Sequence, residues 1–194
     1  MNKHLYYPVI IVVSMVIVSV INILFNPSFP PYVYPVATVI LTVAVIAVDG
    51  LVAWLIRAMP EKHFDYSKKI FHTGKREIRF YEFIGVKKWK DCVPELGMFT
   101  GLRKNKISDP RNPEYLRRYI LEACYGIIIH YASVPASLMI LLLDFGMYKG
   151  ASNLWLTVAL PVAFVNMVLI LLPAFILKYN LPKLVKLYDH LSDK

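Results

Sequence analysis

Four long apolar stretches follow one another along the chain, separated by turns or by polar residues. Each holds about the 20 predominantly apolar residues that a helix needs to cross the hydrocarbon core of a bilayer. They run over about residues 5–25, 33–56, 119–143 and 153–177. The first is longer than the apolar part of a signal peptide, and no small-residue cleavage site follows it, so we expect it to be retained. The pattern predicts an all-α membrane protein with four transmembrane helices in a single domain over residues 1–194.

Basic residues gather between the second and third apolar stretches. Hydrophobic residues make up 57% of the chain, and its formal net charge is +9. The segment 59–118, named the connecting segment from here on, holds 15 Lys or Arg against 8 Asp or Glu, whereas the turns at 26–31 and 144–152 are nearly uncharged. Because positive charge marks the cytoplasmic side, we expect the connecting segment and both termini to be cytoplasmic. We therefore expect a multi-pass protein of the cell membrane.

The connecting segment is too rich in aromatic and branched aliphatic residues for a disordered linker. Residues 80–90 interleave apolar and basic side chains, which suits an element lying in the membrane interface. The run Asp-Pro-Arg-Asn-Pro-Glu at 109–114 predicts a turn and the start of the third helix. We therefore expect a structured basic segment whose partners are membrane lipids with anionic headgroups, and we expect no nucleic-acid partner.

A few polar residues interrupt the apolar stretches, where an ionisable group is costly. Glu122 is interpreted either as a snorkelling or ion-paired interfacial carboxylate or as a general base or metal ligand. His130 is interpreted either as a neutral imidazole that is hydrogen-bonded across helices or as a catalytic group. Asp49 is most simply paired with a neighbouring helix. Asn22 and Asn166 are of a residue type that, within a membrane, most often forms hydrogen bonds between helices.

Glu122 and His130 are expected on one helix, eight residues apart. Their side chains then point to neighbouring faces and lie about 12 Å apart along the axis. A direct hydrogen bond between them is impossible in a straight helix. The two groups could still line one cavity at two depths.

His72 and Glu77 in the connecting segment have a spacing that resembles the His-x4-acid pair of glycerolipid acyltransferases, where the carboxylate orients the imidazole as a base. The sequence has no G-x-S-x-G elbow, P-loop or H-E-x-x-H motif. Cys92 and Cys124 form neither a disulfide framework nor a zinc pattern, so both are expected as free thiols.

Three stretches together resemble a known family. Residues 85–95 read Gly-Val-Lys-Lys-Trp-Lys-Asp-Cys-Val-Pro-Glu, residues 115–130 place Tyr-Leu before Glu122, Cys124 and His130, and residues 178–184 read Lys-Tyr-Asn-Leu-Pro-Lys-Leu after Pro173. Their order and spacing over about residues 75–188 resemble the glycosyl-4,4'-diaponeurosporenoate acyltransferase family. The chain differs from the family pattern at Tyr125, Ile127 and Leu181, where the family carries charged residues.

The resemblance implies a membrane enzyme that acylates a hydroxyl of a glycosylated isoprenoid, in carotenoid biosynthesis, or of another lipid at the cytoplasmic leaflet. We expect His130 or His72 as the general base and Glu122 or Glu77 as its orienting carboxylate. The acyl donor would be a thioester such as acyl-coenzyme A, without a further cofactor. The candidate substrate-binding residues are Lys87, Lys88, Lys90 and Arg103 for donor phosphates, Trp89 as an interface anchor, and Asn166, Tyr179 and Asn180.

Two other functions remain open from the residues alone. A non-enzymatic lipid-binding or partner protein would use the basic segment for headgroups and the buried polar groups only to hold helices together. A metal-dependent enzyme would bring Glu122, His130 and a histidine of the connecting segment to one ion. The acyl donor, the acceptor and the oligomeric state are not encoded in a recognisable motif.

Overall fold

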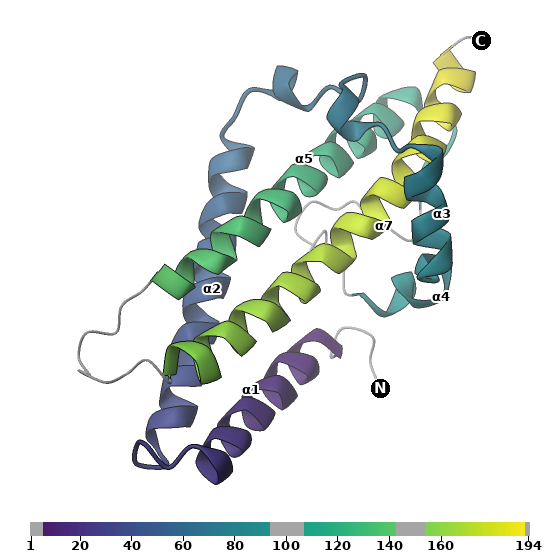
Figure 1. Ribbon diagram of the computed structural model, residues 1–194. Helices are drawn as coiled ribbons and strands as arrows, with labels where there is room; N and C mark the ends of the chain where they lie inside the picture. Colours follow the sequence, from purple (N-terminus) through teal and green to yellow (C-terminus); the bar gives the residue numbers. More distant parts are fainter. Residues whose placement is uncertain (1–5, 94–106, 143–153, 193–194) are drawn as a thin grey trace. The chain divides into compact units, whose positions relative to one another are not determined.

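The computed structural model describes residues 6–93, 107–142 and 154–192, and these residues contain helices and turns but no strand. Among them, four helical stretches are long and apolar enough to cross a membrane (Figure 1). This confirms the prediction of an all-α protein with four potential spans. The long helices are α1 (Tyr6–Phe25), α2 (Val33–Arg57), α5 (Pro113–Leu138, extended by a 3₁₀ turn η6, Met139–Leu142) and α7 (Leu160–Ser192, preceded by a π-helical turn η7, Trp155–Ala159).

The described part of the connecting segment consists of short helices. A glycine with positive φ, Gly85 at +68°, separates two of them, because it adopts the left-handed conformation that other residues rarely tolerate. Residues 94–106 lie outside the described ranges, and Arg103 with them. The short helices are η2 (Glu61–Phe64), η3 (Lys69–Phe71), α3 (Lys75–Phe83), α4 (Val86–Trp89) and η4 (Lys90–Cys92).

The start of α5 follows the turn predicted at 109–114. The Asn112 side-chain oxygen accepts hydrogen bonds from the backbone N–H groups of Glu114 at 3.0 Å and Tyr115 at 3.1 Å, and Pro113 occupies the first helical position. This is an N-cap followed by a proline whose missing N–H costs nothing there. The helix therefore begins within the predicted turn, six residues before the apolar stretch that starts at about 119.

The end of α7 differs more from the prediction. The apolar stretch ends at about 177, but the helix continues through Pro182 to Ser192. Tyr179, Leu181 and Leu184 are all buried in this extension. Packing inside the protein therefore maintains the helix where its sequence is no longer apolar enough for lipid.

The chain divides into two compact units. Unit 1 contains residues 56–130 and 172–194 together with the N-terminal end, and unit 2 contains residues 7–55 and 131–171. Each is described by itself below.

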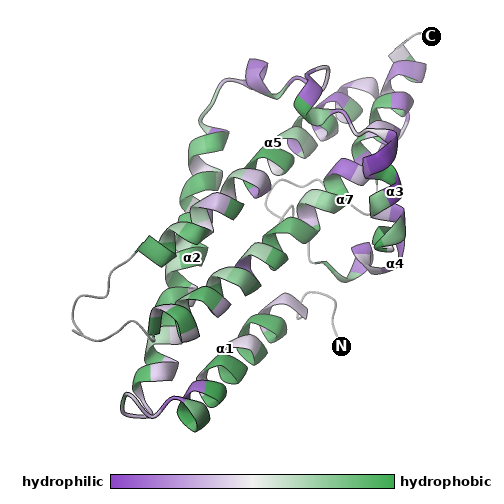
Figure 2. Ribbon diagram, in the orientation of Figure 1, coloured by the Kyte–Doolittle hydropathy of each residue, from purple (hydrophilic) through white to green (hydrophobic). Residues whose placement is uncertain are grey.

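Unit 2 is a helical bundle with a small apolar core. Its buried residues come from the first part of α2, from the end of the third apolar stretch and from the start of the fourth. The side chains on the outside of α1 and α2 are also apolar, as the colouring of α1 in Figure 2 shows, and many are more than 40% exposed. An apolar exterior around an apolar core is expected of helices that face lipid. The core residues are Tyr34, Leu41, Val45, Ile140, Leu154, Val158, Ala159, Val162 and Ala163.

The polar residues of unit 2 bond to neighbouring helices. Asn22 on α1 donates to the carbonyl of Thr157 at 2.9 Å. Thr157 belongs to the π-helical turn, whose i→i+5 hydrogen bonds differ from those of a regular α-helix. Asn166 on α7 donates to the Asp49 carboxylate of α2 at 3.0 Å. These bonds confirm the interhelical interpretation of Asn22, Asn166 and Asp49.

In unit 1, α3 lies beside the C-terminal half of α7 (Figure 1), and aromatic rings fill the contact. Tyr81 of α3 has its ring centroid 5.5 Å from that of Phe175 and 6.3 Å from that of Tyr179. The helices α5 and α7 approach closely at Gly126, where an added Cβ would lie 2.7 Å from a methyl carbon of Leu177. The core of unit 1 thus joins the connecting segment to both long helices.

Candidate functional site

A polar cleft follows one face of α5 in unit 1. Its volume is about 380 Å³. Most of the lining residues recur along α5 at intervals of three or four positions, which places them on one side of the helix over three turns. The cleft is lined by Arg57, Glu61, Glu114, Arg117, Arg118, Leu121, Glu122 and Tyr125.

Glu122 is held in this cleft by a two-pronged ion pair with Arg57, the last residue of α2. The Nη2–Oε2 distance is 3.0 Å and the Nη1–Oε1 distance is 3.5 Å. The Glu122 side chain is 23% exposed, so it is partly shielded yet reachable from the cleft. The ion-paired interpretation of Glu122 is therefore confirmed, and the pair fixes the direction of its carboxylate.

Tyr125, one turn further along α5, ties this end of the cleft together. Its hydroxyl donates to the carbonyl of Met59 at 3.3 Å, and its ring stacks on Phe64 with centroids 3.9 Å apart. The guanidinium carbon of Arg57 lies 5.8 Å from the centre of the same ring. The cleft thus has one aromatic wall and, because it contains three arginines and three glutamates, no large excess of either charge.

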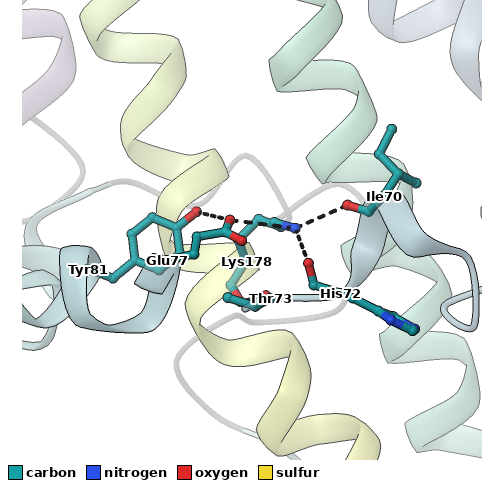
Figure 3. Close-up of polar contacts among 6 residues, drawn as sticks. All are labelled: Ile70, His72, Thr73, Glu77, Tyr81 and Lys178. Carbon is teal, nitrogen blue, oxygen red and sulfur yellow. Dashed lines mark hydrogen bonds and ion pairs between the residues drawn. The ribbon is translucent and has the colours of Figure 1, made fainter. Parts of the chain in front are cut away.

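A second polar cluster, drawn in Figure 3, surrounds Lys178 on α7. Although it is a lysine, its exposed fraction is only 4%. The Nζ atom donates to the carbonyls of Ile70 at 3.0 Å and His72 at 2.8 Å, and it lies 3.5 Å from the Glu77 carboxylate. Buried ammonium groups require such partners, because desolvation otherwise disfavours the charge.

The same cluster fixes the orientation of α3. The Tyr81 hydroxyl donates to Glu77 at 2.5 Å, one helical turn away, and the Thr73 hydroxyl donates to the carbonyl of Lys178 at 2.9 Å. Glu77 therefore binds a lysine and a tyrosine. The imidazole of His72 points away from Glu77 in Figure 3, and His72 contributes its carbonyl instead. The structure does not bring the His72 and Glu77 side chains together as a pair.

The other predicted site residues are distributed over both units. His130 is half-buried on α5, two turns beyond Glu122 on the same continuous helix. Tyr179 is buried beside Tyr81, Asn180 is half-buried on α7, and Asn166 belongs to unit 2.

The predicted residues of the connecting segment lie on or next to α4. Lys87 and Lys88 on α4 are exposed, Lys90 is half-buried, and the indole of Trp89 donates to the carbonyl of Ile84 at 2.9 Å.

Three contributors were missed by sequence reasoning. Lys178 was noted as the first residue of the stretch 178–184, and nothing in the sequence distinguishes it from Lys183 and Lys186 of the same helix, which are exposed. Arg57 gave no signal, because its partner Glu122 lies 65 residues away. Arg117 and Arg118 could have been found from the sequence, because they lie four residues before Leu121 and Glu122 respectively and therefore on the same side of α5.

A metal centre finds no support in this part of the chain. Across residues 6–93, 107–142 and 154–192, no three His, Cys, Asp or Glu side chains are grouped so that they could hold an ion. Glu122 instead pairs with Arg57, and both cysteines are free thiols, as expected from the sequence.

Comparison with known proteins gives one result. The sequence model of the glycosyl-4,4'-diaponeurosporenoate acyltransferase family matches residues 61–190, which is more than half of the chain. No curated protein and no solved structure matches. The matched region includes the cleft residues of α5 and the whole Lys178 cluster, but it begins after Arg57.

Proposed function

The chain belongs to the glycosyl-4,4'-diaponeurosporenoate acyltransferase family, and we propose that it is a membrane-embedded acyltransferase that acylates a hydroxyl of a glycosylated isoprenoid or of another lipid. The observation that carries this proposal is the family match over residues 61–190. The four apolar helices agree with a substrate that is dissolved in the membrane. The acyl donor would be a thioester such as acyl-coenzyme A.

The α5 cleft supplies groups suited to this reaction. The acceptor oxygen attacks the thioester carbonyl carbon, its proton passes to a base, and the C–S bond breaks to release a thiol once the sulfur is protonated. Glu122 can take the proton, because it lines the cleft and the pair with Arg57 fixes the position of its carboxylate. Arg117 and Arg118 can stabilise the negative charge that develops on the carbonyl oxygen.

His130 is the alternative base. It lies two turns from Glu122 on α5, further into the apolar stretch of that helix. The helical geometry rules out a direct bond between the two side chains, so they act separately or not at all. Lys87, Lys88, Lys90 and Arg103 are proposed to bind the phosphates of the donor.

The test is acyl transfer by the purified protein in lipid nanodiscs, with acyl-coenzyme A and a glycosylated isoprenoid as substrates. We expect Glu122→Gln or His130→Ala to lower kcat by about 10²-fold or more, which is the usual contribution of a general base. Asp189→Asn, an exposed carboxylate on α7, serves as the control. Full activity in both variants would remove the two residues from the mechanism.

The same assay separates the enzyme from the non-enzymatic alternative. A lipid-binding or partner protein would show no turnover with any thioester, while its helices and its affinity for lipid stayed intact. Retained lipid binding without turnover in the wild-type protein would therefore favour that alternative.

We also infer that the connecting segment and both ends of the sequence face the cytoplasm. The support is the excess of basic residues in the segment 59–118 over the short turn at 26–31. Labelling of intact cells with a membrane-impermeant maleimide tests the orientation. A cysteine introduced by Ser28→Cys should react, whereas the native exposed Cys92 should react only after the membrane is opened.

A further inference from the structure

The outward side of α3 combines arginine and phenylalanine. Arg76, Arg79, Phe80 and Phe83 recur at spacings of three and four, so they share one side of the helix. Phe83 is 88% exposed and Phe80 is 47% exposed, whereas Tyr81 on the other side is buried. These four residues are named the α3 outer face. Among the described residues of unit 1, Phe80 contacts Phe175 of α7 at a centroid distance of 5.9 Å but stays about half exposed, and Phe83 is almost fully exposed, although a phenylalanine in water is unfavourable.

The orientation of this face is fixed rather than incidental. Tyr81 and Glu77 on the opposite side of α3 are bound to each other, and Glu77 also pairs with the buried Lys178. The phenylalanines cannot be turned inward unless these contacts break. The same contacts that bury one side of α3 therefore present the other side outward.

The charges beside the phenylalanines identify what covers them. Arg76 and Arg79 are exposed on the face itself, and Lys87 and Lys88 are exposed on α4, the next helix along the chain. Helices that lie in a membrane interface combine aromatic side chains with basic ones, which reach the phosphates of anionic lipids. The chain has four helices apolar enough to span a bilayer, so a lipid surface is available to the same molecule.

We propose that the α3 outer face lies in the headgroup region of the bilayer and binds anionic phospholipids there. Phe80 and Phe83 enter the boundary of the hydrocarbon, and Arg76 and Arg79 bind phosphates. This proposal does not depend on acyl transfer, because it would hold equally for a protein without catalytic activity.

The experiment places an environment-sensitive NBD fluorophore on α3 in the full-length protein. The labelled variant is Phe83→Cys with Cys92→Ser, since the remaining Cys124 is buried. The control, also with Cys92→Ser, carries the label at His190→Cys, an exposed position on α7. Both are reconstituted in nanodiscs of phosphatidylcholine alone or with phosphatidylglycerol, and quenching by doxyl-labelled lipids is measured.

We expect the label at position 83 to emit at shorter wavelength than the label at position 190 and to be quenched by doxyl lipid, more strongly in the anionic nanodiscs. An emission and quenching equal to those at position 190 would overturn the proposal. A blue-shifted emission without lipid quenching would also overturn it, because a protein surface, such as a second copy of this chain, would then cover the face.

The role of the arginines has its own control. Charge reversal by Arg76→Glu and Arg79→Glu should weaken the lipid quenching in anionic nanodiscs. The equilibrium constant for binding of the α3 outer face to anionic lipid should fall roughly fivefold for each favourable charge lost. The matched variant Lys62→Glu with Lys186→Glu changes the net charge equally at exposed positions outside the face. Equal losses in both variants would show that only net charge matters and would contradict specific binding by the face.

Discussion

The two units use polar side chains differently. The buried polar residues of unit 2 among the described residues are uncharged, namely Ser19, Asn22, Thr38, Ser133 and Ser137. In unit 1 the corresponding residue is a lysine, Lys178, which binds two carbonyls and a carboxylate. Short neutral groups cost little in lipid because the helix backbone can satisfy them, whereas a charge requires several partners from different segments. The fold of unit 1 therefore depends on a fully buried charge, whereas in unit 2 the half-buried Asp49 carboxylate is bound by the neutral amide of Asn166.

The largest expected effect tests this dependence directly. Lys178→Met removes the donor of two backbone carbonyls and leaves Glu77 with the Tyr81 hydroxyl but without its cation, which should lower the free energy of unfolding by about 3 kcal/mol. The midpoint of thermal unfolding in detergent should fall by roughly 6–12 °C. Lys186→Met, an exposed lysine of the same helix, should change it little. Equal midpoints for the two variants would contradict the special role of Lys178.

A smaller effect compares the packing of glycines in the two units. Gly126→Ala in unit 1 places a Cβ 2.7 Å from a Leu177 methyl, so we expect a loss of about 1–2 kcal/mol. Gly50→Ala in unit 2 meets nothing within 4 Å and should be neutral or stabilise α2 by up to about 1 kcal/mol. Thermal unfolding measures both. Opposite signs would support a tight contact of α5 with α7, and equal signs would argue against it.

Within unit 2, Asn22→Leu removes the hydrogen bond to the Thr157 carbonyl. Interhelical bonds of this kind in membranes contribute about 1 kcal/mol, so the loss should be correspondingly modest. Val20→Leu, on the exposed side of α1, should leave the unfolding midpoint unchanged. A loss for Asn22→Leu as large as that for Lys178→Met would erase the proposed difference between the units.

The smallest effect on stability is expected at the α5 cleft. Arg57 is 44% exposed, so Arg57→Gln should cost less than about 1 kcal/mol. Its effect on acyl transfer should be larger, because the Glu122 carboxylate loses the group that orients it. Comparing kcat with the unfolding midpoint separates the two roles. A large loss of stability at full activity would make the pair structural instead of functional.

The sequence predicted the spans well, since a helix in lipid must be apolar along its whole length. It predicted the start of α5 from Asn112 and Pro113, because a cap depends only on neighbouring residues. It failed at the end of α7, where burial of Leu181 and Leu184 inside unit 1 maintains the helix. Helix ends outside the membrane are decided by packing that the local sequence does not specify.

The candidate site was predicted only in part. Glu122 was found because a carboxylate in an apolar stretch is conspicuous, and its pairing was among the expected interpretations. Its partner Arg57 and the bonds of Lys178 join segments 65 and 106 residues apart. No local pattern encodes such contacts. The spacing of His72 and Glu77 gave a misleading signal, because Glu77 turns to Tyr81 and Lys178 instead.

The position of Lys178 also sets the order in which the parts of the protein can fold during synthesis on the ribosome. The carbonyl of His72 is synthesised 106 residues before the ammonium group that binds it. At about 5–20 residues per second, this delay lasts roughly 5–20 seconds. During that time α3 emerges without the contact that fixes its orientation, and the Tyr81 ring lacks Phe175 and Tyr179 of α7 to pack against. Chains that stop short of α7 should therefore be recognised by proteases, although most of their apolar helices are already complete.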